Sequence, residues 1–443
     1  MKTFQIGGTH PEENKFAKDS QIETFPLPKQ GVVFVNQHLG APSKLLVEKG
    51  QKVKVGELLA KAEAFICANL HSPYSGTISK IDFAIDISGY KKQAIFIDVE
   101  GDEWLEDIDR TKDIIREIKL DSKQIIEKIK EKGIVGLGGA AFPTHVKYMI
   151  PEGKKAEFLI INAVECEPYL TSDYRAMLEH TEEAFVGIEI MKRALNVDKA
   201  FIGIEDNKPE AIKLMTEFSK KYKNTEVVPL KTKYPQGAEK QLIFAITKRE
   251  VPSGKLPIEV GCVVNNLGTS IAIYQAVQKN KPLIDNIMTL TGKNVKAQKN
   301  LLVRVGTPLN SIIDYFGGLP EDTGKLISGG PMMGKAISDI NAPTTKTTSS
   351  ILVINQKEAK RKEITNCLRC GKCVTVCPMG LEPILLAQLS ENRRWEDAEK
   401  EFAMDCIECG CCLFTCPAGR PLLDTIRVAK SNIGELRRQR AMK

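Results

Sequence analysis

Residues 406–417 read CIECGCCLFTCP, and residues 367–378 read CLRCGKCVTVCP. Both stretches follow the spacing C-x2-C-x2-C-x3-C-P, and they hold nine of the chain's twelve cysteines, five in the former and four in the latter. The chain starts without the apolar stretch of an export signal, so thiols this dense indicate metal or redox use rather than disulfide bonds. Two structural zinc sites are the alternative, although zinc sites usually split their ligands into two separated pairs.

The repeated spacing is that of bacterial ferredoxins, in which three closely spaced cysteines bind one [4Fe-4S] cluster and the fourth binds the other cluster. It predicts two clusters, held by two crossed sets of cysteines: Cys367, Cys370, Cys373 and Cys416 for the first, and Cys406, Cys409, Cys412 and Cys377 for the second. Cys411 breaks the spacing and is expected to be a buried spare. Residues 381–405, between the motifs, read as helix, so we expect a helical two-cluster ferredoxin domain that moves single electrons.

Length and composition place these motifs in a soluble protein of several domains. A chain of 443 residues is too long for one core, and no apolar run is long enough to cross a bilayer. The net charge of +7 is mild, and no basic stripe carries interleaved aromatic residues, so nucleic acid is not expected as a partner. The closing GELRRQRAMK reads as a solvated basic tail.

Residues 31–100 predict a small β domain, because apolar and polar positions alternate around glycine turns. This stretch resembles the biotinyl and lipoyl carrier fold. A carrier needs a lysine on the hairpin between its two halves, and the corresponding FICANLHSP (65–73) has none. We therefore expect a scaffold rather than a carrier.

From residue 111 onward, helical and strand-like patterns alternate, which predicts a mostly parallel α/β sheet. Its first helix is expected to begin after Asp121 as N-cap and to stop at Gly133. Short strands and glycine turns follow, with one helix at PLNSIIDYFGG (308–318), and predict a separate small α+β module. The polar NAPTTKTTSS (341–350) reads as a linker to the cysteine domain.

The loop GLGGAA (136–141) matches G-x-G-x-x-A, which alone is weak evidence for a dinucleotide site. A helix rather than a strand is predicted before it, so the Rossmann context is missing. Glycines still let backbone amides approach a phosphate closely, and a helix starting at Pro143 would favour the negative charge. A tight helix-to-helix turn is the alternative.

Three segments together, GLGGAAFPTHVK (136–147), NAVECEP (162–168) and VVNNLGTS (263–270), resemble the flavin-binding subunit of respiratory complex I, which takes hydride from NADH onto FMN. The resemblance implies a set of FMN-binding residues: Gly136, Gly138, Gly139, Lys147, Asn162, Glu165, Asn265, Asn266 and Thr269. It also implies NADH contacts at Phe142, Glu167 and Glu239. Val164 replaces an acidic residue of that family, and YPQGAEKQ (234–241) replaces its second glycine–glutamate segment, which leaves the nucleotide affinity open.

The fold class is thus multidomain α/β and α+β. Four parts are expected: an N-terminal region with a carrier-like β domain (1–105), an FMN/NADH-binding α/β domain like that of the complex I protein (106–280), a small β-grasp-like α+β module (281–345), and the helical two-[4Fe-4S] ferredoxin domain with its basic tail (346–443).

From end to end the chain resembles the RnfC family, the C subunits of the Rnf electron transport complexes. The resemblance rests on GGTHPEENK (7–15), VGTPLNSIIDYFGG (305–318) and GGPMMGKA (329–336), together with the flavin and cluster motifs. It implies an oxidoreductase subunit, peripheral on the cytoplasmic face of the membrane, that exchanges hydride between NAD(H) and FMN. Single electrons would pass through the two clusters to or from integral membrane and iron-sulfur or flavin subunits coupled to ion translocation, with ferredoxin reached through another subunit.

Two other interpretations stay open from the sequence. One is a soluble flavin and iron-sulfur reductase acting on a cobalamin cofactor, which shares much of this layout. The other is a pure electron-carrier or scaffold subunit whose flavin pocket is vestigial, because of Val164 and the altered segment at residues 234–241.

Overall fold

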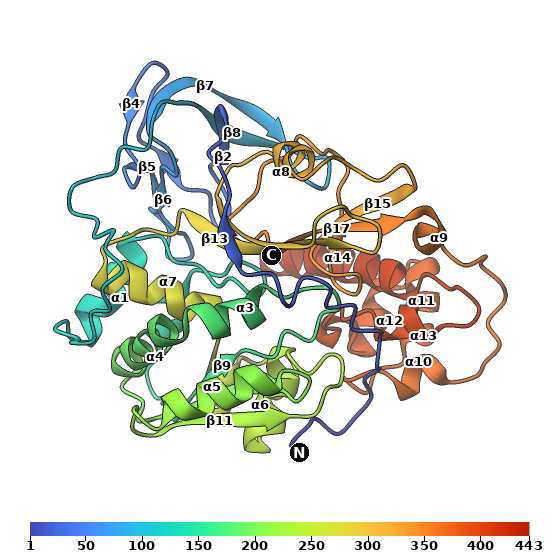
Figure 1. Ribbon diagram of the computed structural model, residues 1–443. Coiled ribbons are helices and arrows are strands. Elements are labelled where there is room, and N and C mark those ends of the chain that lie inside the picture. The colour runs from blue at the N-terminus through green and yellow to red at the C-terminus, as the bar shows by residue number, and fades with distance from the viewer. Residues whose placement is uncertain (443) are drawn as a thin grey trace.

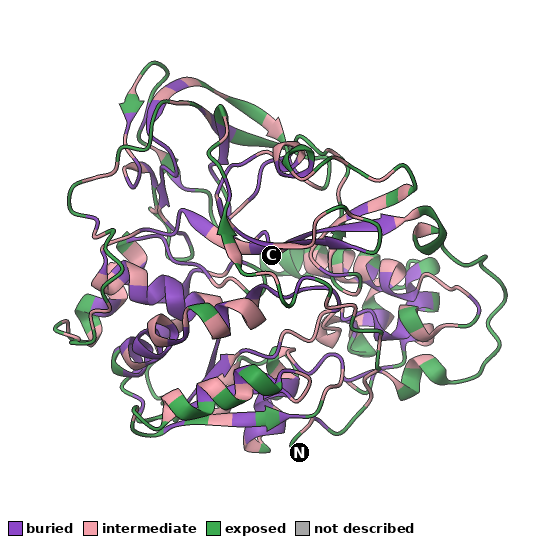
Figure 2. Cartoon of the chain, in the orientation of Figure 1, coloured by how far each residue is buried: buried purple, intermediate pink, exposed green. Residues whose placement is uncertain are grey.

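The computed structural model describes residues 1–442, and within them the strands form four sheets (Figure 1). Figure 1 shows the N-terminal β domain at the top, the α/β domain at the lower left and the cysteine-bearing helices at the right. Buried residues follow the sheets and the helix faces packed on them, whereas the loop Lys360–Cys370 is exposed throughout (Figure 2). No helix in the described part of the chain is long and apolar enough to cross a membrane.

The N-terminal domain consists of two antiparallel sheets, as the alternating pattern predicts. Its strands are β2 (Gln30–Phe34), β3 (Lys44–Leu45), β4 (Lys52–Val53), β5 (Leu58–Lys61), β6 (Leu70–His71), β7 (Gly76–Ile85) and β8 (Lys91–Val99). Val33, Leu59 and Ile95 form part of the core between them. The segment that would carry a carrier's lysine lies against the α/β domain, where Asn69 Nδ2 donates to the Glu131 carbonyl at 3.0 Å.

The α/β domain has one parallel four-stranded sheet in the order β11-β10-β9-β12, as predicted. Its elements are α1 (Ser122–Glu131), α2 (Thr144–Tyr148), β9 (Phe158–Asn162), α3 (Ser172–Glu179), α4 (Thr181–Leu195), β10 (Lys199–Glu205), α5 (Pro209–Ser219), β11 (Thr225–Leu230), α6 (Glu239–Thr247), η1 (Pro257–Val260), β12 (Cys262–Asn266) and α7 (Leu267–Gln278). Alternate residues of β9 serve two cores. Leu159 and Ile161 pack with α4 and α7, and Ile160 packs with α6 on the other face. The predicted N-cap is confirmed, because Asp121 and Gln124 form a reciprocal capping box.

The third module is a six-stranded sheet in the order β1-β14-β13-β17-β15-β16. Its elements are β1 (Ile22–Thr24), β13 (Asp285–Gly292), β14 (Lys299–Arg304), α8 (Leu309–Tyr315), β15 (Thr323–Ser328), β16 (Lys335–Ala336) and β17 (Ser350–Asn355). The sheet takes in an N-terminal strand and a strand beyond residue 345, where the sequence placed the domain boundary. Residues 341–350 are not a free linker, because Thr344, Lys346 and Ser350 are buried and the Lys346 ammonium donates to the carbonyls of Asn69 and Gly133.

The C-terminal domain is helical between the two cysteine motifs, as predicted. Its elements are α9 (Gln356–Ala359), α10 (Lys372–Thr375), α11 (Pro383–Glu391), α12 (Trp395–Lys400), η2 (Ala403–Asp405), α13 (Cys411–Thr415) and α14 (Leu422–Ala441). Leu386 of α11 and Ile426 of α14 share its apolar core. The closing basic residues that the structure describes are exposed, as predicted, but they lie in the last turns of α14 rather than in a free tail, and Arg437 and Arg440 form ion pairs with Glu399 of α12.

Candidate functional site

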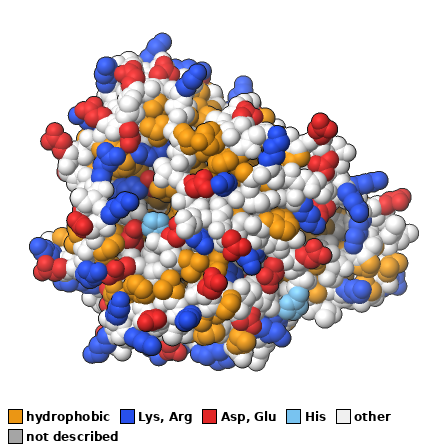
Figure 3. Space-filling model, in the orientation of Figure 1, with side chains coloured by type: hydrophobic (Ala, Val, Ile, Leu, Met, Phe, Trp, Pro, Cys, Tyr) orange, Lys and Arg blue, Asp and Glu red, His pale blue; other side chains and the backbone are white. Residues whose placement is uncertain are grey.

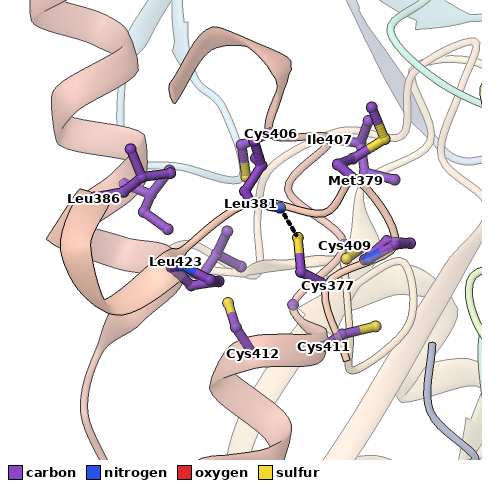
Figure 4. A pocket seen from close by; sticks show the side chains of 14 residues that line it. Cys377, Met379, Leu381, Leu386, Cys406, Ile407, Cys409, Cys411, Cys412 and Leu423 are labelled. Atoms are coloured by element: carbon purple, nitrogen blue, oxygen red, sulfur yellow. Dashed lines mark hydrogen bonds between the residues drawn. The ribbon is translucent and has the colours of Figure 1, made fainter. Parts of the chain in front are cut away.

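One cavity of the C-terminal domain is lined by Cys377, Cys406, Cys409 and Cys412 (Figure 4). We call it the inner cavity. The remaining lining is mostly apolar and includes Met379, Leu381, Leu386 and Leu423. Cys377 belongs to the first motif and the other three cysteines to the second, so the chain crosses over as the ferredoxin spacing predicts. Whether these four sulfurs bind a cluster stays a prediction.

Cys411 also lines the inner cavity, yet its sulfur points away from the space that the sulfurs of Cys377, Cys406 and Cys412 face (Figure 4). Its side chain is fully buried beside Tyr234 and Cys409. A hydrogen bond from the Cys411 thiol lowers the pKa of Cys409. The spare cysteine is buried, as expected from the sequence.

The second cavity, which we call the outer cavity, is lined by Cys367, Cys370, Cys373 and Cys416. Cys367 and Cys370 are exposed and lie in the exposed loop before α10. Basic side chains surround them, with Arg369, Lys372 and Arg420 among the lining residues. Figure 3 shows Lys and Arg side chains gathered at the right-hand edge of the molecule, where the segment after α9 lies. The outer cavity is therefore partly formed by residues at the surface.

Three of the four predicted ligands in the inner cavity, Cys377, Cys406 and Cys412, are buried in a way that favours the protonated thiol. Burial raises the pKa of Cys406 to about 11 and also raises the pKa values of Cys377 and Cys412. Iron binds the thiolate, so metal binding here must release protons. Among residues 1–442, no three His, Cys, Asp or Glu side chains are arranged to hold a single metal ion. In a [4Fe-4S] cluster, each cysteine binds a different iron and the sulfurs need not converge on one point.

The glycine loop lies at the carboxyl edge of the parallel sheet, where Asn162 of β9 is paired in register with Asn266 of β12. This edge is where open α/β sheets bind ligands. A side chain added at Gly139 would meet nothing within 4 Å, and one at Gly136 would approach only the Phe142 carbonyl, at 3.8 Å. The Leu137 amide donates to Thr269 Oγ1 at 3.1 Å, which fixes the loop to α7. The backbone is thus open at Gly136 and Gly139, whereas Gly138 packs against Asn266, whose Cβ would lie 2.9 Å from an added side-chain carbon.

The asparagines of this edge are held in part and free in part. Asn266 caps α7 through the Gly268 amide and donates to Asp173 Oδ2 at 2.7 Å. Asn162 Nδ2 donates to the Gly237 carbonyl at 2.8 Å. Within the described residues, Asn265 Nδ2 is buried without a hydrogen-bond partner. A buried amide left unpaired is costly, and the Tyr148 hydroxyl, which is buried beside it, is the group placed to pair with it.

Lys147 and Glu239 are brought together from α2 and the start of α6. The Lys147 ammonium lies 3.6 Å from the Glu239 carboxylate and donates to the Val264 carbonyl at 2.6 Å. Phe142 closes the glycine loop through its carbonyl, which accepts the Gly136 amide at 2.9 Å. The residues assigned to FMN and NADH by resemblance therefore adjoin one another here, including Glu239 from the segment in which the family pattern is altered.

Glu165 and Glu167 have partners that the sequence did not reveal. The Glu165 carboxylate accepts the Asp173 and Tyr174 amides at the start of α3, at 2.7 and 3.2 Å. The Glu167 carboxylate accepts the Met332 and Met333 amides at 2.7 and 2.9 Å. Both side chains hold the loop in place, and a direct contact with a cofactor stays a prediction for each.

Three residues near the site were missed from the sequence. The Lys15 ammonium donates to the carbonyls of Glu165, Glu167 and Leu170 at 2.7–2.9 Å. Burial, followed by the charge of Glu165, raises the pKa of Asp173 to about 7. Tyr234 donates its hydroxyl to the Cys409 carbonyl at 2.8 Å. Only Tyr234 had a signal, as the first residue of the segment that departs from the complex I pattern.

Tyr234 also shows how the parts are ordered. Tyr234, Cys409 and Cys411 share an apolar cluster with Cys166 of the NAVECEP loop and with Met332. The inner cavity therefore adjoins the NAVECEP loop (162–168), which we call the nucleotide loop. Cys367 and Cys370 of the outer cavity are instead exposed. The spacing of the motifs does not indicate which set of cysteines lies nearer to the NAVECEP loop.

Family models cover most of the chain. They are the RnfC barrel sandwich hybrid domain over residues 2–102, the Nuo51 FMN-binding domain over 129–275, the SLBB domain over 287–336 and the 4Fe-4S dicluster domain over 359–417. The dicluster match disfavours the alternative of two zinc sites.

Similar curated proteins match nearly the whole chain. The C subunit of the proton-translocating ferredoxin:NAD(+) oxidoreductase complex of Clostridium ljungdahlii is 44% identical over 91% of this chain and 87% of its own length. The C subunit of the Na(+)-translocating complex of Acetobacterium woodii is 40% identical over 99% and 98%. Among solved structures, an NAD+-reducing [NiFe]-hydrogenase matches with a TM-score of 0.51 at 18% identity, over 71% of this chain and 63% of that one, which shows a shared fold.

Proposed function

Because this chain belongs to the RnfC family, the C subunits of ion-translocating ferredoxin:NAD(+) oxidoreductase complexes, we propose that it is the NAD-side electron-transfer subunit of such a complex. The observation that carries the proposal is the arrangement of three parts in one chain. They are a glycine loop in an FMN-binding domain, an inner cavity lined by four of the predicted cluster cysteines, and an outer cavity lined by the other four, of which two are exposed. Each part matches one requirement of a path between NAD(H) and a redox partner.

FMN and two [4Fe-4S] clusters, when bound, supply the exchange of a two-electron hydride for single electrons. We assign FMN to the set predicted from resemblance, with Gly136, Gly138 and Gly139 offering backbone amides. Asn265 is kept in this set on the resemblance. Lys147 places a positive charge at the edge of the sheet, and a positive charge beside a flavin favours its reduced, anionic form.

For NAD(H), we retain Phe142 and Glu239 as direct contacts. Glu239 is half exposed, at 44%, and its ion pair with Lys147 is long enough to leave the carboxylate open to a ligand. Glu165 stays in the FMN set and Glu167 in the NADH set, and both also hold the loop that positions Asn162 and the residues after it.

The exposed cysteines and basic residues around the outer cavity suit contact with partner subunits. We place the protein peripherally on the cytoplasmic face of the membrane. There it would bind integral membrane and iron-sulfur or flavin subunits that translocate the ion, with ferredoxin acting through another subunit.

Cofactor content after anaerobic purification and reconstitution tests this proposal. The expected result is about eight irons per chain, since two cubanes use the eight assigned cysteines, and one noncovalent FMN. Iron without flavin would refute the NAD-side assignment and favour the carrier or scaffold function. Stimulated reduction of a cobalamin cofactor by the isolated chain would favour the soluble reductase instead.

A further inference from the structure

The first fifteen residues form an extended strap that joins parts of the molecule far apart in sequence (Figure 1). We define the N-terminal strap as Lys2–Lys15. At its start, Lys2 forms a parallel bridge with Leu230 at the end of β11. At its end, Lys15 holds the NAVECEP loop through three carbonyls. Between these points the strap passes the inner cavity, so one segment contacts both the nucleotide loop and the cysteine domain.

Gly7 and Gly8 make the contact with the cysteine domain. The Gly8 amide donates to the Val376 carbonyl at 2.9 Å. Gly7 has a φ of +64°, and a side-chain carbon there would lie 2.4 Å from the Cys377 carbonyl oxygen. Only glycine allows this approach, because both the backbone conformation and the space exclude a larger residue. Cys377 is the cysteine of the first motif that crosses to the inner cavity.

The next residue of the strap reaches Tyr234. The Thr9 amide donates to the Tyr234 carbonyl at 2.8 Å, and the Tyr234 amide donates to the Thr9 carbonyl at 2.9 Å. The Tyr234 hydroxyl in turn donates to the Cys409 carbonyl. Cysteines from both motifs that line the inner cavity, Cys377 and Cys409, are therefore held directly or through one tyrosine by Gly7–Thr9.

We propose that the N-terminal strap is a positioning element that fixes the inner cavity against the nucleotide loop, and that Gly7 sets this spacing. The proposal rests on the proposed function, because the spacing matters only if electrons pass between these two places. The strap need not touch a cofactor. It acts through Cys377, Tyr234 and the loop at Glu165–Leu170.

Gly7→Ala in the reconstituted full-length protein tests this, with Gly153→Ala as the control. Gly153 also has a positive φ, of +77°, but a side-chain carbon there meets nothing within 4 Å. At Gly7 the added side-chain carbon and the Cys377 carbonyl oxygen must move about 1 Å further apart to reach an ordinary contact distance. Electron transfer between the flavin and a cluster makes no bond, so a displacement of that size lowers its rate only a few-fold. We expect NADH to bleach the flavin at the wild-type rate and the clusters at a rate lowered a few-fold.

A second readout does not depend on activity. In Gly7→Ala, the amides of Gly8, Thr9 and Tyr234 should exchange hydrogen for deuterium faster than in the wild type and in Gly153→Ala, because their hydrogen bonds to the strap or its neighbours are weakened. Unchanged exchange, unchanged cluster bleaching, or equal slowing of flavin and cluster bleaching would each overturn the proposal. Flavin-free wild-type protein would refute the proposed function instead, and the exchange measurement would still test the strap.

Tyr234→Phe provides a test if Gly7→Ala does not fold. It removes only the hydroxyl that donates to Cys409 and keeps the ring in its buried place. The same split, with normal flavin bleaching and slower cluster bleaching, is expected with a smaller factor. Equal loss in both rates would show that Tyr234 serves stability alone.

Discussion

Alanine substitutions made in pairs will show which cysteines share a cluster. Cys377 is the last cysteine of the first motif but lines the inner cavity with Cys406, Cys409 and Cys412, whereas Cys370 lines the outer cavity. The informative pairs are Cys377→Ala with Cys412→Ala, and Cys377→Ala with Cys370→Ala. Alanine is chosen because it cannot replace a thiolate as a ligand.

The expected iron content follows from the two cavities. Two cubanes hold about eight irons, so loss of one cluster leaves about four. Cys377→Ala and Cys412→Ala damage the same cluster, and the pair should keep about four irons, no fewer than either single variant. Cys377→Ala and Cys370→Ala damage different clusters, and that pair should keep almost none.

The assay is iron and acid-labile sulfide per chain after anaerobic reconstitution, with the spin count of the reduced clusters. Cys411→Ser is the matched control inside the inner cavity, and it should keep the full content. If each motif instead bound its own cluster, the two pairs would exchange results, and the crossed assignment would be refuted. Loss of half the iron in Cys411→Ser would show that Cys411 is a ligand.

Three further predictions concern the glycine loop, the pH dependence of stability and the removal of iron. Gly139→Ala should leave the unfolding of flavin-free protein unchanged, because the added side chain meets nothing within 4 Å. In a fluorescence titration it should weaken FMN binding at least about tenfold, or 1.4 kcal/mol. Unaltered affinity would place FMN elsewhere. Folding raises the pKa of Asp173 from 3.8 to about 7. The protonated carboxyl therefore contributes its full stability below the pKa of the unfolded chain, and this stability is lost as pH rises through the pKa of the folded protein. Urea midpoints should therefore fall between about pH 4 and 7 in the wild type and fall less in Asp173→Asn; parallel curves would contradict this. Anaerobic chelation of iron should unfold residues 360–430, because bonds to the clusters hold the loops around α10 and α13. Loss of helical circular dichroism and the appearance of new protease sites would show this unfolding. A domain that stays helical and protease-resistant without iron would count against it.

Features governed by local chemistry were predictable from the sequence. The spacing of the cysteines predicted which of them line each cavity, and cluster binding by these two sets stays a prediction. The capping box of Asp121 and Gln124 involves residues three apart, and the sequence was sufficient to find it. The parallel sheet likewise follows from the alternation of strand and helix patterns.

Features that depend on contacts between distant segments were not predictable. Lys15 lies 150 residues or more from the carbonyls it binds, and nothing near it in sequence indicates them. Strand β1 completes a sheet whose other strands begin at residue 285. Glu165 and Glu167 illustrate a second limit, because a carboxylate that caps backbone amides and one that faces a nucleotide look identical in sequence. Contacts between segments distant in sequence form only when the tertiary fold brings those segments together.

The most direct measurement of the NAD-side role is an anaerobic titration of the reconstituted chain with NADH, followed by visible absorption and electron paramagnetic resonance. If this protein joins NAD(H) to a one-electron path, NADH should bleach FMN and then reduce both iron-sulfur clusters in the absence of any partner. Bound iron with no flavin and no response to NADH would contradict that role and leave an electron carrier.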